Sequence, residues 1–290
     1  MVGTHTLRTA DGTLYYELRG GEGPVLVLTG APMGAEEFTP LADLLARDHT
    51  VLTHDPRGIS HSPLNDPEQD STPELRADDL IALLDTLNAD SADVLGSSGG
   101  AVTSPALAER YPDRVRTVVA HEPPLLGSLP DAAAQHAAVE RIIQTYLEEG
   151  VFAAWAAFMA NAGFPMEESD DGAPVEEPTE RMLADSRRFY LHELRGTTRH
   201  VPDTDALRAG PVRMLLGLGA ESATLLTART TRALADRLGT EPITFPGGHG
   251  GFADVPEEFA EVLREVLAGG TPVRGVRSTE DSRAPAGGHM

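Results

Sequence analysis

The stretch Val94-Leu95-Gly96-Ser97-Ser98-Gly99-Gly100-Ala101 decides how the rest of this 290-residue chain is interpreted. It joins an apolar, strand-like run to a helix-like run, and its centre fits the pattern Gly-x-Ser-x-Gly. A turn this tight between a strand and a helix forces strained backbone dihedrals and leaves no room for bulk two residues before and after the serine. Gly96 and Gly100 meet that requirement, so the pattern predicts that Ser98 projects from the turn as a nucleophile.

Strand-like and helix-like stretches alternate on both sides of this turn. The predicted strands cover residues 4–8, 13–18, 24–28, 50–53, 92–95, 115–120, 212–216 and 242–245, and the predicted helices cover residues 37–47, 71–87, 101–111, 223–238 and 256–267. The first two strands flank Asp11-Gly12, a dipeptide that favours a hairpin turn, and the later strands alternate with helices. Such alternation builds a parallel sheet. We therefore expect the α/β class, with a mostly parallel eight-stranded sheet flanked by helices.

The alternation is interrupted in the middle of the chain. Helices without intervening strands are predicted over residues 131–149, 151–162 and 181–194. This pattern predicts a helical cap of residues 125–208, inserted into a core made of residues 1–124 and 209–268. Residues 269–290 are rich in Gly, Pro, Arg and Ser without periodicity, which is typical of a disordered tail.

Most of the bulky aromatic side chains fall in or beside the predicted cap. One interpretation is that they form the wall of a hydrophobic pocket, and the other is that they pack the cap against the core. The candidate pocket residues are Pro123, Trp155, Phe158, Met159, Phe189 and Tyr190.

A serine hydroxyl becomes a good nucleophile only when a base takes its proton, and histidine has a suitable pKa for that role. Among the ten histidines, His249 has the best context, because it lies on a glycine-rich loop after the last predicted strand. Glycines on both sides let this loop bend the imidazole toward the serine. His54, His61 and His121 sit on loops that could border the same cleft, and His54 or His61 is the substitute base.

The base needs a carboxylate that holds its tautomer and stabilises the imidazolium ion. Two residues compete for this role. Glu221 follows the predicted strand over residues 212–216, which is the commoner place for the acid, and Glu122 lies at the end of the strand after the serine's helix. Spacing alone leaves this choice open.

Attack on a carbonyl also creates a negative oxygen that needs N–H donors. The backbone N–H of Gly99, which follows the nucleophile, is the first predicted donor. Gly30 or Ala31, in the loop after the strand over residues 24–28, supplies the second.

Composition excludes several classes of partner. The chain has 45 Asp and Glu against 23 Lys and Arg, a formal net charge of −22, which argues against binding to nucleic acid or to an anionic membrane. It has no cysteine and therefore no disulfide, no thiolate nucleophile and no cysteine-ligated metal. We expect no metal and no cofactor. Because no signal peptide or membrane-spanning run is visible, we expect a cytoplasmic protein. The oligomeric state stays open, with a homodimer among the states allowed.

Four ordered motifs resemble those of the α/β-hydrolase superfamily over about residues 14–267. They are Thr29-Gly30-Ala31-Pro32, Asp55-Pro56-Arg57-Gly58-Ile59-Ser60-His61-Ser62, Gly96-Ser97-Ser98-Gly99-Gly100 and Gly248-His249. Thr29 departs from the family, which usually has histidine before the glycine. Within the superfamily, the chain resembles the zearalenone-lactonase group, which opens a macrolactone ring and takes its acid from a His-Glu-x-Pro segment. This second resemblance implies that Glu122, in His121-Glu122-Pro123-Pro124, is the acid rather than Glu221.

Together these features predict a cofactor-free serine hydrolase that cleaves a small hydrophobic ester or lactone, with a zearalenone-type macrolactone as one substrate. Ser98 is the predicted nucleophile, His249 the base and Glu122 the acid. Two alternatives remain. One is a ligand-binding, receptor-like protein with a vestigial triad, since the same fold serves both purposes. The other is perhydrolase chemistry or acyl transfer.

Overall fold

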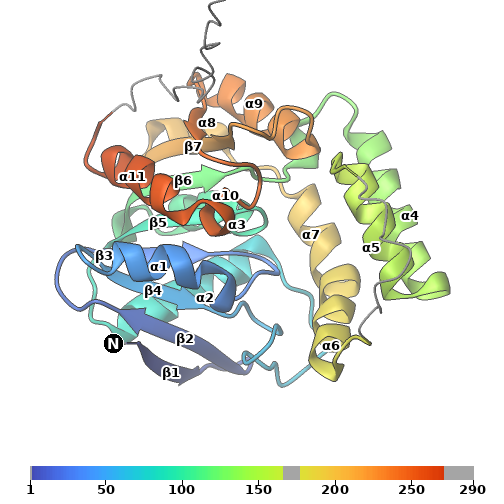
Figure 1. The fold of residues 1–290 in the computed structure, drawn as a ribbon, viewed down its shortest axis with the longest axis horizontal. Coiled ribbons are helices and arrows are strands. Elements are labelled where there is room, and N and C mark those ends of the chain that lie inside the picture. The colour runs from blue at the N-terminus through green and yellow to red at the C-terminus, as the bar shows by residue number, and fades with distance from the viewer. Residues whose placement is uncertain (1, 166–176, 271–290) are drawn as a thin grey trace, which may run out of the picture.

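Eight strands form one sheet in the part of the chain that the computed structural model describes, which is residues 2–165 and 177–270 (Figure 1). The strand order is β1-β2-β4-β3-β5-β6-β7-β8, and β2 runs antiparallel to both of its neighbours while the remaining pairs are parallel. The strands are β1 (Gly3–Arg8), β2 (Thr13–Arg19), β3 (Val25–Thr29), β4 (Thr50–His54), β5 (Ala92–Ser97), β6 (Val115–His121), β7 (Arg213–Gly219) and β8 (Ile243–Phe245). The predicted fold class is therefore confirmed. The predicted tail lies, from residue 271 onward, outside the described residues.

The helices connect these strands. They are α1 (Thr39–Leu45), α2 (Pro73–Thr86), α3 (Gly100–Arg110), α4 (Ala132–Glu149), α5 (Val151–Ala162), α6 (Glu180–Arg188), α7 (Leu194–Arg199), α8 (Thr204–Ala209), α9 (Leu226–Leu238), α10 (Gly251–Asp254) and α11 (Pro256–Leu267). The start of α2 shows how the sequence sets a boundary, because Thr72 accepts a hydrogen bond from the N–H of Leu75 and Pro73 occupies the first helical position. Among the described helices, none combines the length and apolar character needed to span a bilayer.

Helices cover both faces of the sheet. Successive residues of a strand point to opposite faces, and β3 shows this division. Leu26 and Leu28 belong to a buried cluster shared with α1 and α11, whereas Val27 belongs to a second cluster shared with α2 and α3. In Figure 1, α1 and α11 lie in front of the sheet and α2 and α3 lie behind it. The central strands are thus buried on both sides, as continuous apolar runs such as Val25–Thr29 predict.

Four helices between β6 and β7, namely α4, α5, α6 and α7, stand beside the sheet at the right of Figure 1. Their buried side chains form a third cluster that includes Ile142, Ile143 and Tyr190. Leu125 and Leu207, at the two ends of the predicted cap segment, pack instead in the cluster that Val27 shares with α2 and α3.

The prediction of one helix over residues 181–194 is wrong. Helix α6 ends at Arg188, a π-helical turn covers Phe189–Glu193, and α7 follows. A π turn holds an extra residue, which rotates everything after it and breaks the regular apolar stripe that sequence periodicity detects. Both Tyr190 and Glu193 are buried by this turn. The short helices α8 and α10 were not predicted either.

Strand β7 runs three residues further than the sequence indicates, to Gly219. This extension places Gly217 opposite His121 in the β6–β7 pairing. The N–H of Glu122 then donates to the carbonyl of Gly217 at 3.0 Å. The carboxyl ends of β5, β6 and β7 therefore hold three predicted site segments next to one another.

Candidate active site

Ser98 occupies the tight turn between β5 and α3. Its φ angle of 54° lies in the left-handed region, which a non-glycine residue rarely adopts. The turn is fixed by a hydrogen bond of 3.0 Å from the Ser98 N–H to the carbonyl of His121 and by one of 2.9 Å from the Ala101 N–H to the carbonyl of Ser98. A Cβ at Gly96 would overlap the backbone of Gly100, so bulk is excluded at that position. The Ser98 side chain stays partly exposed while its neighbours are buried.

The loop after β3 lies directly against this turn. A Cβ on Gly99 would lie 2.8 Å from the Cβ of Ala31, and one on Gly100 would lie 2.9 Å from the Cα of Gly30. Only glycine permits this approach. Among the described residues, the N–H groups of Gly99 and Ala31 donate no hydrogen bond to protein. The structure thus brings together the predicted oxyanion donors beside Ser98.

Glu122 follows β6 and is fully buried. Its φ angle of 54° is also left-handed, a strained conformation at a glutamate. Its Oε1 accepts the N–H of Gly219 at 2.9 Å, and its Oε2 accepts hydrogen bonds from His249 and from Thr227, each at 2.7 Å. Burial by itself would raise the pKa of this carboxyl, but the His249 hydrogen bond and the nearby imidazoles lower it to about 2. Glu122 is therefore ionised at neutral pH.

His249 lies in the glycine-rich loop between β8 and α10. The backbone turns at Gly247, where φ is 74°, and the Gly251 N–H donates to the carbonyl of Gly248 at 3.0 Å. The His249 side chain is 19% exposed, so one edge of the ring is accessible. Because the Glu122 carboxylate is ionised, Nδ1 of His249 carries the hydrogen, and Nε2 is left free to accept a proton.

Glu221, the alternative acid, does not reach this pair. It is exposed, and its backbone N–H donates to the carbonyl of Gly247 at 3.0 Å. This bond ties the loop after β7 to the His249 loop. In the structure, His249 is hydrogen-bonded to Glu122 and not to Glu221.

Comparisons with known proteins show to which family the chain belongs. The family model described as alpha/beta hydrolase fold matches residues 23–155. The uncharacterized hydrolase YraK of Bacillus subtilis is 31% identical over 268 residues, which is 90% of this chain and 95% of the relative. The chain belongs to the α/β-hydrolase family. It is also similar to a zearalenone hydrolase of Bionectria ochroleuca, at 26% identity over 273 residues, 90% of this chain and 96% of the relative.

Solved structures support the same fold. A thermophilic esterase from Thermogutta terrifontis superposes with a TM-score of 0.71 at 21% identity, covering 93% of this chain and all of the esterase chain. The prediction that this α/β-hydrolase is a hydrolytic enzyme is confirmed, since its curated relatives are named hydrolases. The predicted resemblance to zearalenone-cleaving enzymes is confirmed as well.

The other three candidate histidines of this α/β-hydrolase each make a polar contact within the fold. Nε2 of His54 lies 3.0 Å from Oγ1 of Thr29, and Nδ1 of His61 lies 2.8 Å from Oδ2 of Asp55. His121 lies behind the site, with Nδ1 at 3.3 Å from Oγ of Ser97. Burial lowers the pKa of both His54 and His121 to about 4, so these two rings are neutral at pH 7. Neither substitute base, His54 nor His61, is hydrogen-bonded to Glu122.

The predicted pocket residues differ in burial, from fully buried to half-exposed. Tyr190 is buried within the helices and stacks on Tyr146, with ring centroids 4.8 Å apart. Trp155 is 52% exposed and stacks on Phe158 at 5.7 Å, and Phe158 meets Phe189 edge-to-face at 5.4 Å. Met159 is half-buried and Pro123 is buried. These contacts make an aromatic row across the helices, and whether substrate touches the row stays a prediction.

Two residues that sequence reasoning missed contact His249 and Glu122. Phe164 follows α5 and meets the His249 ring edge-to-face at 5.8 Å. Thr227, in the first turn of α9, donates to Glu122. Gly163 helps to place Phe164, because it ends α5 with a φ angle of 87° and packs against the carbonyl of Thr224. No motif marks either residue in the sequence, since both contacts arise from long-range packing.

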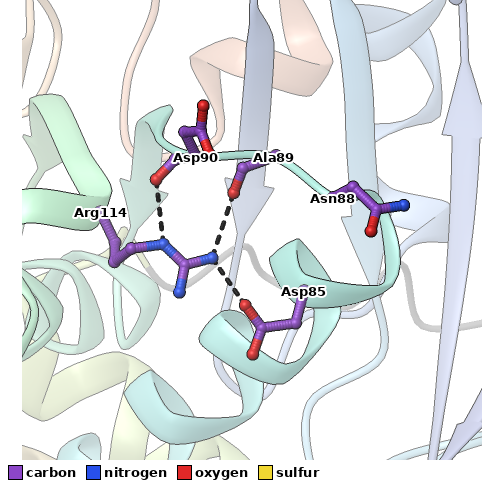
Figure 2. A pocket seen from close by; sticks show the side chains of 5 residues that line it. All are labelled: Asp85, Asn88, Ala89, Asp90 and Arg114. Atoms are coloured by element: carbon purple, nitrogen blue, oxygen red, sulfur yellow. Dashed lines mark hydrogen bonds and ion pairs between the residues drawn. The ribbon is translucent and has the colours of Figure 1, made fainter.

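A surface pocket shown in Figure 2 lies away from this site. It is lined by Asp85, Asn88, Ala89 and Asp90, at the end of α2 and before β5, and by Arg114, which directly precedes β6. Ser98 follows the other end of β5, about 20 Å along the strand. The guanidinium of Arg114 donates to Asp85 at 2.7 Å and to the carbonyls of Ala89 and Asp90 at 3.1 and 2.9 Å (Figure 2). Arg114 thus stabilises the loop between α2 and β5. The candidate active site is instead the group around Ser98, Glu122 and His249.

A metal site is not visible in residues 2–165 and 177–270, where no group of three or more His, Asp or Glu side chains converges to hold an ion. The cluster at Glu122 consists of one carboxylate and donors to it. These hydrogen bonds hold the His249 imidazole against an ionised carboxylate.

Proposed function

We propose that this α/β-hydrolase cleaves a carboxylic ester or lactone of a hydrophobic substrate through a Ser98–His249–Glu122 triad. One observation carries the proposal, namely the 2.7 Å hydrogen bond from Nδ1 of His249 to the buried carboxylate of Glu122. A buried, ionised acid on one imidazole nitrogen makes the other nitrogen a base at neutral pH. The strained turn that presents Ser98 supports the same role.

The reaction follows from these positions. Ser98 Oγ attacks the carbonyl carbon as its proton passes to Nε2 of His249, and Glu122 stabilises the imidazolium. The negative oxygen of the tetrahedral intermediate accepts hydrogen bonds from the N–H groups of Gly99 and of Ala31 or Gly30. His249 then gives its proton to the leaving alkoxide, which leaves an acyl group on Ser98. Water, deprotonated by His249, attacks that acyl group and releases the acid.

The surroundings of the base support a hydrophobic substrate. Phe164 contacts the imidazole directly, and the aromatic row from Trp155 through Phe158 to Phe189 lies on the adjacent helices. An apolar wall favours substrates that bury carbon surface on binding. Since the relative from Bionectria ochroleuca is named a zearalenone hydrolase, we propose a zearalenone-type macrolactone as the first substrate to examine.

The test compares hydrolysis of zearalenone with hydrolysis of p-nitrophenyl esters of increasing acyl length, in the wild-type enzyme and in Ser98→Ala. We expect turnover in the wild type and its loss in folded Ser98→Ala. If only the p-nitrophenyl esters are hydrolysed, the proposal of an ester hydrolase stands and the proposal of a macrolactone substrate is wrong. Substantial activity in Ser98→Ala would overturn the proposed function.

A further inference from the structure

The carboxylate of Glu122 is held by three donors from three different segments. Gly219, at the end of β7, donates to Oε1 at 2.9 Å. His249 and Thr227 both donate to Oε2 at 2.7 Å. The backbone adds a fourth restraint, the bond from the Glu122 N–H to the carbonyl of Gly217. Because the side chain is fully buried, no water replaces a lost donor without rearrangement.

The segment after β7 is where the sequence suggested the alternative acid, Glu221. In the structure, Gly219 at the end of β7 and Thr227 in α9 donate to Glu122 instead. A side chain at Gly219 would overlap the carbonyl of Gly248, at 2.7 Å from its Cβ, so no acidic residue fits at the end of β7. The following helix, α9, begins with Leu226 and places the Thr227 hydroxyl on Glu122. The backbone at the end of β7 and the side chain of Thr227 in α9 thus both donate to Glu122, which follows β6.

We propose that Thr227 is a positioning residue of the triad, whose hydroxyl fixes the orientation of the Glu122 carboxylate toward His249. The role rests on the proposed function, since it acts through the triad acid. Thr227 shares Oε2 with the imidazole, so its hydrogen bond does two things. It prevents rotation of the carboxylate about its last bond, and it takes up part of the negative charge that would otherwise stabilise the imidazolium.

Three substitutions separate positioning from packing. Thr227→Val removes the hydroxyl and keeps the branched shape, and Thr227→Ser restores the hydroxyl. Thr231→Val is the matched control, because this buried threonine is on the same helix but its hydroxyl donates to the carbonyl of Thr227 at 2.7 Å rather than to Glu122. His121 and His249 are the titratable groups whose charges act on Glu122, and neither is changed by these substitutions.

The measurement is the rate of Ser98 phosphonylation by a fluorophosphonate, followed as a function of pH. In this step the serine oxygen displaces fluoride and the serine proton goes to His249. For Thr227→Val we expect the plateau rate to fall about ten-fold. We also expect the acidic limb to move to higher pH by about half a unit, because the less compensated carboxylate holds the imidazolium more tightly. Thr227→Ser should restore both, and Thr231→Val should change neither limb nor plateau.

Two outcomes would overturn the inference, and they differ. If wild type is labelled at Ser98 and Thr227→Val shows the rate and the limb of wild type, Thr227 has no positioning role while the triad stands. Thr227 also has no positioning role if Thr227→Val lowers the phosphonylation rate equally at every pH and Thr227→Ser does not restore the rate. If well-folded wild type is not labelled at all, the proposed function fails, and the role of Thr227 fails with it.

Discussion

Nδ1 of His249 lies 2.7 Å from Oε2 of Glu122, although 127 residues separate the two in sequence. The bond joins the loop after β8 to the end of β6, across the intervening β7. Each partner depends on local backbone strain or glycine, since Glu122 has a left-handed φ and the His249 loop turns at Gly247. A strained backbone at Glu122 therefore accompanies the contact between Glu122 and His249. Such strain is typical of functional sites.

Replacement of the acid should abolish most turnover. Glu122→Gln keeps size and backbone but removes the charge that stabilises the imidazolium, so we expect kcat to fall by about three orders of magnitude. Glu221→Gln, at the exposed alternative, should stay within about two-fold of wild type. Steady-state kinetics on a p-nitrophenyl ester provide the measurement. A larger loss in Glu221→Gln than in Glu122→Gln would assign the acid to the segment after β7.

The contact between Phe164 and His249 should affect both catalysis and substrate binding. Phe164→Ala removes the ring that meets the imidazole edge-to-face, so we expect kcat/KM for a hydrophobic ester to fall about ten-fold. Phe164→Leu should recover part of the loss, because it restores apolar surface without the ring. Leu147→Ala, at a 60% exposed position of α4, is the control for truncating an apolar side chain of these helices. Unchanged kinetics in Phe164→Ala would remove the residue from the site.

Close approach of backbones at Gly100 should make this position intolerant of any side chain. In Gly100→Ala the new Cβ would overlap the carbonyl of Thr29 and force the loop after β3 away, so we expect a loss of about 3 kcal/mol in the free energy of unfolding. Gly196→Ala, in α7, is the matched control, since its nearest contact is the carbonyl of Ser71 at 3.4 Å. Urea denaturation of both variants measures the difference. Equal stability would show that the loop is not packed as closely as described.

Acid should destabilise the fold partly through His54. Burial lowers its pKa to about 4 from an ordinary value of 6.5, so the unfolded chain binds this proton first as the pH falls. The contribution of His54 to stability is therefore complete above about pH 6.5 and declines by on the order of 3 kcal/mol between pH 6.5 and 4. His54→Gln, which retains an N–H donor or carbonyl acceptor near Thr29, should show a shallower decline in urea denaturation between pH 7 and 4.5. His5→Gln, at an exposed histidine, is the control, and identical slopes for wild type and His54→Gln would contradict the prediction.

Local patterns in the sequence predict most of the fold. The Gly-x-Ser-x-Gly turn at Ser98, the hairpin around Asp11-Gly12 and the apolar strands such as β3 all depend on residues close in sequence. Contacts that depend on register are different. Whether Glu122 or Glu221 meets His249 is decided by how far β7 extends and how it pairs with β6, and neither is encoded by periodicity.

The cap shows the same limit. Its helices are predictable from composition, but the π turn at Phe189–Glu193 adds a residue that periodicity does not detect. The side chains that contact His249 and Glu122, namely Phe164 and Thr227, are ordinary residues in their local sequence. Their importance comes from elements that the fold brings together, and they become visible only with the three-dimensional arrangement.

Mass spectrometry of the intact protein after reaction with a fluorophosphonate tests most directly whether Ser98 is a nucleophile. Wild type and Ser97→Ala, whose altered hydroxyl is buried beside His121, should each gain one adduct, and Ser98→Ala should gain none. That result would identify Ser98 as a nucleophile activated by the His249–Glu122 pair. An adduct on folded Ser98→Ala, or no adduct on folded wild type, would contradict the assignment of Ser98 as the nucleophile.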